Sequence, residues 1–188
     1  MNYIDITKED VANGTGIRVT LWCAGCRMQC AGCHNPESHN FNAGEKFTNQ
    51  TMDEICDALK PDYINGLTLS GGHPLDPRNI DTVIDIVRKV KLNFPNKTIW
   101  LYTGYTLCSE HFTTTYHGGS SSAKLHNKLN EALTLCDVVV DGCYQEDLRD
   151  ITLKFRGSSN QRIIDVKETI KGGIISVIRE DDLCNNKL

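Results

Sequence analysis

Short apolar runs rich in β-branched and aromatic residues alternate along the chain with longer segments in which apolar residues recur at helical spacing. Runs of the first kind are typical of strands; they occupy residues 17–22, 66–70, 98–102 and 137–142, with weaker runs at 163–164 and 174–178. The second pattern is that of amphipathic helices, and it covers residues 51–59, 80–94 and 125–133. Residues 1–13 and 181–188 are predicted to be irregular.

Local signals mark where these helices begin and end. Thr51 and Glu54 have the spacing of a capping box, so the first helix is predicted to open at Thr51. Pro95 cannot continue a helix, so the second helix is predicted to stop before it. Residues 36–49 and 108–126 are polar and predict loops, the second of them a low-complexity insertion.

Strands that alternate with helices predict an α/β fold whose sheet is mostly parallel. Right-handed crossovers bring the C-terminal ends of parallel strands to one edge of a sheet. The loops at 23–36, 71–77 and 103–105 each follow a predicted strand. We therefore expect them to meet at that edge, where α/β sheets bind their ligands.

One of these loops carries four of the nine cysteines, and three of them, Cys26, Cys30 and Cys33, have the spacing C-x3-C-x2-C. A [4Fe–4S] cluster has four irons and usually four thiolate ligands. Three cysteines leave one iron open, and an open iron can bind a substrate. The spacing therefore predicts such a cluster on Cys26, Cys30 and Cys33.

Other sites remain open at this point. With Cys23 the run becomes C-x2-C-x3-C-x2-C, which could be a structural zinc site. Zinc knuckles, however, usually separate their two pairs by a dozen or more residues. The cysteine run of bacterial ferredoxins has another order of spacings and a proline after its last cysteine. Disulfides between cysteines this close in sequence would stabilise little of the chain. Cys23, at the end of a predicted strand, is expected to be a buried thiol.

Composition narrows the class of protein. At 188 residues the chain is expected to form one domain, residues 1–188. A net charge of −4 and the lack of a basic stripe speak against nucleic-acid binding. No apolar stretch is long enough for a membrane span, and we expect no signal peptide. Nine cysteines without an export signal favour the reducing cytoplasm and a metal or redox role. We expect the five scattered ones, Cys56, Cys108, Cys136, Cys143 and Cys184, to be structural or incidental.

The C-x3-C-x2-C triplet resembles that of the radical S-adenosylmethionine (SAM) enzymes, in which the open iron is chelated by SAM. Ser70-Gly71-Gly72-His73 falls where these enzymes carry a Gly-Gly-acidic turn that contacts the methionine ammonium. His73 departs from that pattern, because it stands where these enzymes have an acidic residue. A carboxylate could pair with the ammonium, whereas a neutral imidazole can only accept one hydrogen bond. Gly32 also departs, since many members have an aromatic residue there. The resemblance implies a partial (βα) barrel and SAM contacts from Gly32, Cys33, His34, Ser70, Gly71, Gly72, His73 and Thr103.

Four further stretches resemble the activating enzymes of anaerobic (class III) ribonucleotide reductase: residues 14–16, 100–105, 141–144 and 156–162. The resemblance covers roughly residues 1–165, apart from the insertion at 108–126; residues 166–188 form an extension and tail. It makes Arg18 a candidate for contacting a partner or a carboxylate. Cys143 departs from the family, in which a basic or other polar residue is more usual.

The resemblance implies an oxidoreductase that activates another enzyme. A low-potential donor such as flavodoxin would reduce the cluster, and SAM would be cleaved to methionine and a 5′-deoxyadenosyl radical. This radical would take a hydrogen atom from a glycine of the large subunit of anaerobic ribonucleotide reductase. The short chain would leave the barrel open on one side for that protein substrate.

Two alternatives remain. One is another small radical SAM enzyme, either an activase of a different glycyl-radical enzyme or a deazaguanine-forming enzyme. The other is a zinc-binding module without catalysis. A metal site of His111, His117 and His126 is disfavoured, since their irregular spacing in a polar loop is typical of solvated histidines.

Overall fold

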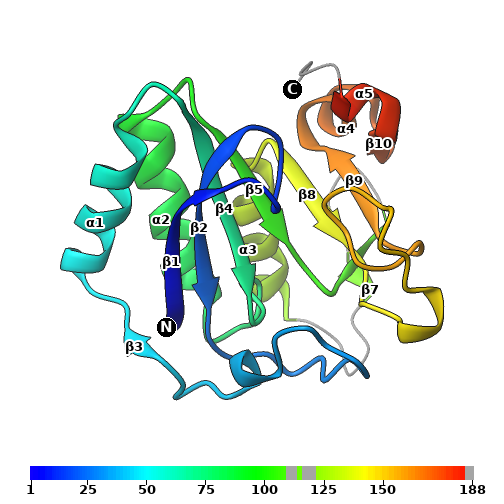
Figure 1. Ribbon diagram of the computed structural model, residues 1–188, viewed down its shortest axis with the longest axis horizontal. Helices are drawn as coiled ribbons and strands as arrows, with labels where there is room; N and C mark the ends of the chain where they lie inside the picture. Colours follow the sequence, from blue (N-terminus) through cyan, green and yellow to red (C-terminus); the bar gives the residue numbers. More distant parts are fainter. Residues whose placement is uncertain (109–113, 116–121, 185–188) are drawn as a thin grey trace.

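The computed structural model describes residues 1–108, 114–115 and 122–184. The main element of this part is an eight-stranded sheet in the order β10-β9-β8-β5-β4-β2-β1-β3 (Figure 1). Its strands are β1 (Asn2–Asp10), β2 (Ile17–Cys23), β3 (Glu45–Lys46), β4 (Ile64–Gly71), β5 (Thr98–Tyr102), β8 (Val138–Asp141), β9 (Arg162–Asp165) and β10 (Ser176–Val177). Two short strands, β6 (Thr106–Leu107) and β7 (Thr114–Thr115), pair with each other.

The four central strands, β2, β4, β5 and β8, are parallel neighbours. The strands on both flanks are antiparallel, so four of the seven pairings in the described sheet are antiparallel. The α/β class is confirmed, but the expectation of mostly parallel strands is wrong. A short connection such as residues 11–16, between β1 and β2, can join only antiparallel neighbours.

The N-terminal segment is the clearest departure from the sequence pattern. Residues 2–10, predicted to be irregular, form β1, which pairs with both β2 and β3. Charged residues such as Asp5, Lys8 and Glu9 interrupt its apolar positions, so the run that marks a buried strand is missing. The backbone pairing with β2 makes this segment a strand in spite of that composition.

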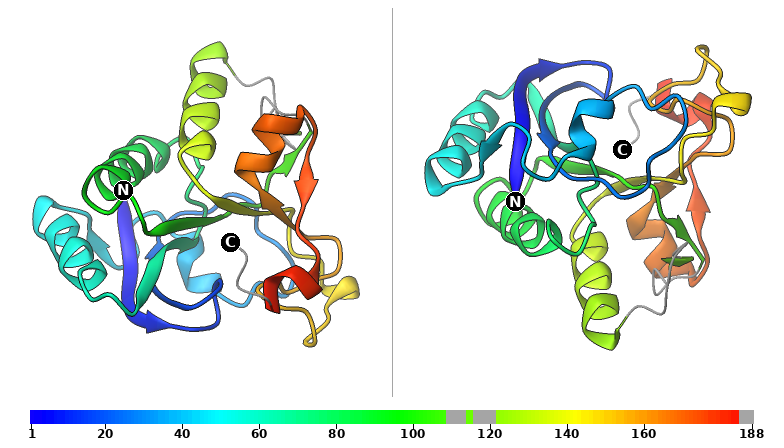
Figure 2. Two further views of the ribbon diagram at one scale, coloured as in Figure 1. Left: turned by 90° about the horizontal axis from the view of Figure 1, so that it is seen from above. Right: turned by 90° about the horizontal axis from the view of Figure 1, so that it is seen from below.

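Three helices cover one face of the sheet, as Figure 2 shows. They are α1 (Asn49–Leu59), α2 (Ile80–Asn93) and α3 (Ala123–Thr134), and each connects two of the parallel strands. Right-handed crossovers that step in one direction along a sheet place their helices on the same face. A shared core lies between helices and sheet, with fully or almost fully buried side chains that include Leu21, Leu67, Leu69, Val83, Val87, Leu101, Leu129 and Leu133.

The first helix begins earlier than its capping box predicted. Helix α1 starts at Asn49, and its N-cap is Thr48, whose hydroxyl accepts a hydrogen bond from the Thr51 amide. The Thr51 hydroxyl in turn accepts from the Thr48 amide. Thr48 and Thr51 thus form the reciprocal cap that was assigned to Thr51 and Glu54, because a threonine can serve at either end of a capping box.

The remaining helices are short: η1 (Pro36–His39), η2 (Glu146–Leu148), α4 (Val166–Gly172) and α5 (Glu180–Cys184). Helix η1 and strand β3 lie in the segment predicted as a loop, and α5 lies in the predicted irregular tail. Of the three histidines considered as metal ligands, His126 lies on α3. His111 and His117 lie outside the described residues.

Arg18 is a buried structural cation rather than a contact for a partner or a carboxylate. It has no solvent exposure, and its guanidinium lies 5.5 Å from the Trp100 ring centre. It donates hydrogen bonds to the hydroxyls of Thr68 and Thr98 and to backbone carbonyls, among them those of Leu67 and Thr98. Burial lowers its pKa to about 10, so it remains charged at neutral pH. Arg18 therefore ties together β2, β4 and β5.

We expect Arg18→Met to lower the free energy of unfolding by about 2–3 kcal/mol, because buried carbonyls and hydroxyls lose their donor. Urea denaturation followed by circular dichroism measures the change. The control is Arg179→Met, whose side chain is 87% exposed and whose loss should cost less than about 0.5 kcal/mol. Equal stability of the two variants would contradict the structural role of Arg18.

Candidate functional site

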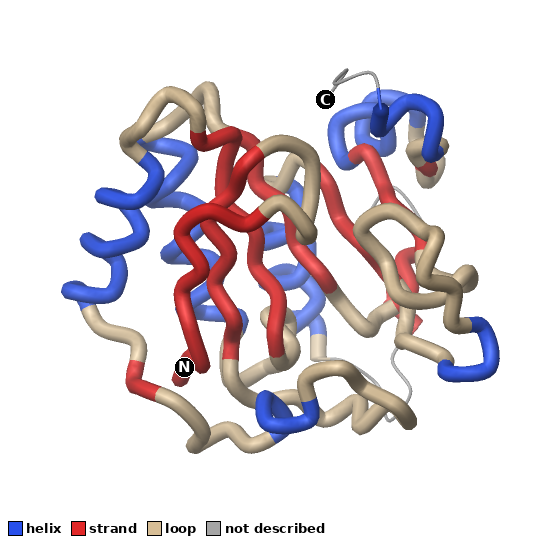
Figure 3. Tube along the Cα trace, viewed as in Figure 1, coloured by secondary structure: helices blue, strands red, loops and turns tan. Residues whose placement is uncertain are grey.

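The loops after β2, β4, β5 and β8 lie at the C-terminal ends of the four parallel strands and surround one cavity of roughly 110 Å³. In Figure 3 the loop from β2 to β3, broken by η1, runs along this edge of the sheet. The topology predicted that three of these loops would meet there. The cavity is lined by Cys26, Met28, Cys30, Cys33, His34, Ser38, His39, Ser70, Gly71, Gly72, His73, Tyr102, Thr103, Gly104, Gly142, Cys143, Tyr144 and Gln161.

All but one of the site residues predicted from the sequence line this cavity. The exception is Gly32, which lines a neighbouring, larger cavity. The loop after β8, with Gly142, Cys143 and Tyr144, also lines the cavity and was not among the predicted site residues. Its signal was the same as for the other three loops, since it directly follows a buried parallel strand.

Cys26, Cys30 and Cys33 are free, partly buried thiols. Nowhere in the described part of the chain are three or more His, Cys, Asp or Glu side chains arranged to hold a metal ion. The three thiols therefore share a cavity without converging on one point. These three side chains are of the type that binds an iron–sulfur cluster, whose ligands are cysteine thiolates. To bind one, the loop has to bring the three sulfur atoms closer together.

The cysteine thiols differ in their surroundings. Burial raises the pKa of Cys26, whereas a hydrogen bond with the Cys143 thiol lowers the pKa of Cys30 to about 6. The same hydrogen bond, with burial, raises the pKa of Cys143. Cys23 lies outside the cavity lining and is fully buried, which raises its pKa to about 12. Cys23 is thus the buried thiol that its place at a strand end predicted.

Backbone hydrogen bonds attach the cysteine loop to the turn after β4. The Gly72 amide donates to the Cys23 carbonyl over 2.6 Å, and the His73 amide donates to the Gly25 carbonyl over 2.9 Å. The buried Asn79 side-chain amide donates to the carbonyls of Ala24 (2.9 Å) and His73 (3.0 Å). The first residues of the cysteine loop are therefore fixed relative to β4 before any ligand binds.

An ion pair strengthens this attachment within the motif itself. Arg27, next to Cys26, pairs with the Asp76 carboxylate over 2.7 Å. The Asp76 side chain is only 2% exposed, and its other carboxylate oxygen accepts from the Arg78 amide. Because an unpaired buried carboxylate is costly, this pair helps hold the loop where Cys26 lies.

Gly71 and Gly72 are required by this close approach of the two loops. A Cβ built on Gly72 would lie 2.8 Å from the Gly25 carbonyl oxygen and 2.9 Å from that of Ser38. Gly71 has a φ of +92°, which favours glycine, and its Cβ would lie 2.7 Å from the Cys23 backbone. These glycines were predicted to permit the approach of a ligand, and in the structure they make room for the neighbouring loop.

His73 is buried and held by its own neighbours. Its Nε2 lies 2.8 Å from the Thr103 hydroxyl, and its ring meets the Tyr105 ring edge-on with centroids 4.4 Å apart. Burial lowers the pKa of His73 to about 4, so the ring is neutral near pH 7. A neutral ring next to the cavity neither repels a cationic ligand nor pairs with it.

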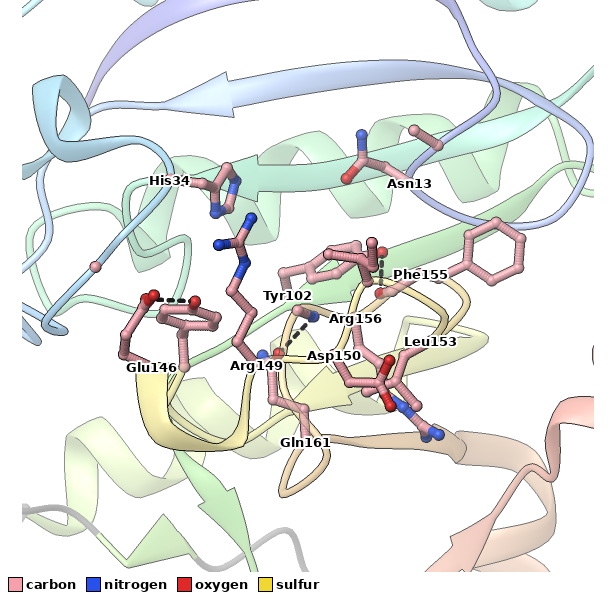
Figure 4. A pocket seen from close by; sticks show the side chains of 15 residues that line it. Asn13, His34, Tyr102, Glu146, Arg149, Asp150, Leu153, Phe155, Arg156 and Gln161 are labelled. Carbon is pink, nitrogen blue, oxygen red and sulfur yellow. Dashed lines mark hydrogen bonds between the residues drawn. The ribbon is translucent and has the colours of Figure 1, made fainter.

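The larger cavity, of roughly 570 Å³, adjoins the first one, and Figure 4 shows the side chains that line it. His34, Tyr102, Tyr144 and Gln161 line both cavities. The Tyr102 hydroxyl donates to the Phe155 carbonyl, and the Tyr144 hydroxyl donates to the Glu146 carboxylate. Ile151, on this lining, is 85% exposed. The small cysteine-lined cavity thus continues into a roomier, partly apolar space.

We expect Gly72→Ala to lower the free energy of unfolding by about 2 kcal/mol, because the added methyl group presses on backbone oxygens that cannot move independently. Thermal or urea unfolding of the cluster-free protein measures this. Gly172→Ala is the matched control, since a Cβ there meets no atom within 4 Å. If both variants were as stable as the wild type, the loops would not be packed as described.

His73 makes stability depend on pH. Its folded pKa of about 4 lies below the unfolded value of 6.5, so the unfolded chain binds the proton more tightly. The stabilising contribution is complete above about pH 6.5 and is lost as the pH falls towards 4, by up to about 3 kcal/mol. Urea unfolding of wild type and His73→Gln between pH 4 and 7 should give curves that converge at low pH. Parallel curves would contradict a buried neutral His73.

Among the described residues, no helix has the length and apolar character needed to cross a membrane.

Comparisons with known proteins agree with the cysteine-lined site. Residues 12–164 match the model of a 4Fe-4S single cluster domain. The chain is 39% identical to the anaerobic ribonucleoside-triphosphate reductase-activating protein of Vibrio cholerae, over 87% of this chain and 97% of that protein. The proteins of the same name from Enterobacteria phage T4 (40% identical, 87% and 93% covered) and Escherichia coli K12 (36%, 86% and 96%) are similarly related. The chain therefore belongs to the family of anaerobic ribonucleoside-triphosphate reductase-activating proteins.

Proposed function

We propose that this protein is a radical SAM activase that generates a glycyl radical on anaerobic ribonucleotide reductase. One observation carries the proposal: the three cysteines of C-x3-C-x2-C line the same cavity as the Gly71–Gly72 turn and Thr103. A cluster with an open iron and a SAM molecule need to lie side by side, and these two motifs come from different strands. The names of the relatives support the reductase as the enzyme that is activated.

In this proposal Cys26, Cys30 and Cys33 hold the [4Fe–4S] cluster. When bound and reduced, such a cluster would supply the electron for cleavage of SAM to methionine and a 5′-deoxyadenosyl radical, and the target glycine would give up a hydrogen atom to that radical. The remaining work of the protein is to hold, orient and shield. The Arg27–Asp76 pair and Asn79 keep the cysteine loop against the turn after β4.

The SAM contacts are proposed on the residues that line the cysteine cavity: Cys33, His34, Ser70, Gly71, Gly72, His73 and Thr103. His73 takes part through its backbone and its neutral ring, since its Nε2 is engaged with Thr103. A neutral imidazole is compatible with a bound sulfonium and ammonium, whereas a charged one would repel them. Gly32, on the adjoining cavity, is proposed to face the adenosine side of the site rather than the methionine side.

The protein substrate is proposed to be the glycine-bearing large subunit of the reductase. The larger cavity next to the cysteines would offer its glycine segment a way in. A low-potential donor such as flavodoxin would supply the electron. The described cysteines are all free, which suits the reducing cytoplasm.

Anaerobic reconstitution with iron and sulfide tests the cluster and SAM together. We expect a brown protein with an EPR signal of a reduced [4Fe–4S] cluster that changes on addition of SAM. Incubation with the anaerobic reductase should then give the doublet of a glycyl radical. Cys30→Ala should lose the cluster, SAM cleavage and the doublet.

The matched control is Cys56→Ala, which removes a thiol on α1, outside the cavity lining. This variant should keep all three signals. A colourless protein with one zinc per chain, or a Cys30→Ala variant that still carries the cluster, would contradict the proposal. A cluster and SAM cleavage without any glycyl doublet on the reductase would point to a different substrate.

A further inference from the structure

A C-terminal extension, residues 166–184, lies beyond the part of the chain that matches the family model, since that match ends at residue 164. The extension comprises α4, β10 and α5, which lie together at one end of the sheet (Figure 1). Strand β10 pairs with β9, and the Ile178 amide donates to the Ile163 carbonyl over 2.8 Å. The proposed activity gives this extension no task.

The extension shares a core cluster with the wall of the larger cavity. Ile178 and Leu183 of the extension are almost fully buried in this cluster. Its other buried members are Trp100, Val138, Val140 and Ile163. Tyr102 and Phe155, which line the larger cavity, pack against the same cluster (Figure 4). The extension therefore supports this side of the cavity from behind.

An ion pair also joins the extension to the cavity wall. Arg156 Nη2 donates to Glu180 Oε1, at the start of α5, over 2.8 Å. Arg156 lines the larger cavity, and its side chain is only 15% exposed. Within the described residues Glu180 is the only partner with which Arg156 forms an ion pair. Because a mostly buried charge without a partner is costly, this pair fixes Arg156 to α5.

Phe155, the residue before Arg156, has a strained backbone. Its φ of +57° lies in the left-handed region, which a bulky side chain rarely adopts. Such a conformation persists only where the surrounding contacts hold it. The Phe155 carbonyl accepts from the Tyr102 hydroxyl over 2.8 Å, and its ring meets the Trp100 ring edge-on with centroids 5.4 Å apart. The pair of Arg156 with Glu180 holds the residue that follows.

We propose that Glu180 is a positioning residue, whose ion pair with Arg156 holds Phe155 in its left-handed conformation and keeps the wall of the larger cavity preformed. Without the pair, residues 149–157 relax and the Tyr102 hydroxyl loses its acceptor. Neither Phe155 nor Arg156 lines the cysteine cavity, so that cavity keeps its shape. The effect on activity rests on the proposed function, in which the glycine segment of the reductase enters through the larger cavity. The effect on the loop does not.

Hydrogen–deuterium exchange of the cluster-free full chain tests the effect on the loop. We expect Glu180→Ala to raise the exchange rates of the backbone amides in residues 149–157 about fivefold, because a charge-assisted hydrogen bond to a partly exposed carboxylate is lost. The matched control is Glu168→Ala, which removes a carboxylate of the same extension that pairs with Lys171 within α4. This control should leave the rates unchanged. Equal rates in Glu180→Ala and the wild type would overturn the proposal.

A double variant tests whether Glu180 acts through the strained residue. Glycine adopts the left-handed conformation without strain, so in a Phe155→Gly background Glu180→Ala should not accelerate exchange in residues 149–157 any further. The same fivefold increase in that background would overturn the proposal, since Glu180 would then only anchor α5. If Phe155→Gly does not fold, the comparison of Glu180→Ala with Glu168→Ala decides.

The reconstituted protein tests the effect on activity. We expect Glu180→Ala to raise the concentration of reductase that gives half-maximal glycyl radical formation about fivefold, in line with the loosened wall. SAM cleavage without the reductase should stay at the wild-type rate. An unchanged dependence on the reductase in a variant whose loop exchanges faster would overturn the positioning role. Failure of the wild type to cleave SAM would instead count against the proposed function and leave the exchange result standing.

Discussion

The close contact between the cysteine loop and the turn after β4 determines the shape of the site. Two backbone hydrogen bonds, from Gly72 to Cys23 and from His73 to Gly25, join segments that are far apart in the sequence. Neither bond could form if Gly72 carried a side chain, since a Cβ would meet the oxygens that accept these bonds. The position of Cys26 therefore depends on the lack of a side chain at Gly72.

The two ends of the parallel strands are stabilised differently. Near the N-terminal ends, Arg18 is buried and donates hydrogen bonds to carbonyls and hydroxyls of β4 and β5. At the C-terminal ends the buried ring is a neutral histidine, and the buried Asp76 is paired with Arg27. The first end is held by hydrogen bonds of a buried cation, and at the second the thiols line one cavity beside a hydrogen-bonded turn. This arrangement suits a site that closes around a group inserted after folding.

Much of the fold could be predicted because burial leaves a strong pattern. The strand at residues 98–102 has the predicted limits because its middle residues are all buried. The convergence of loops after β2, β4 and β5 followed from topology alone. Strand β1 could not be predicted, since its charged residues hide the pattern and only its pairing with β2 reveals it.

The site was predictable in its residue types and less so in its contacts. Gly71 and Gly72 were expected to permit the close approach of a ligand, and what approaches them in the structure is the cysteine loop itself. Gly32 lines the adjoining cavity and not the cysteine-lined one, because spacing along a loop does not give direction. That Cys143 lines the same cavity as Cys30 depends on how the β8 loop meets the β2 loop, which no local pattern encodes.

The edges of the sheet have a consequence for association between molecules. In the described part of the chain the sheet ends in two-residue strands on both sides, Glu45–Lys46 and Ser176–Val177. Both residues of the first are exposed and charged. A strand of another molecule would find few unpaired backbone amides and carbonyls to pair with at these edges. Short or charged edge strands of this kind discourage edge-to-edge aggregation. A protein whose central strands are mostly buried can thereby keep them from pairing with those of another copy.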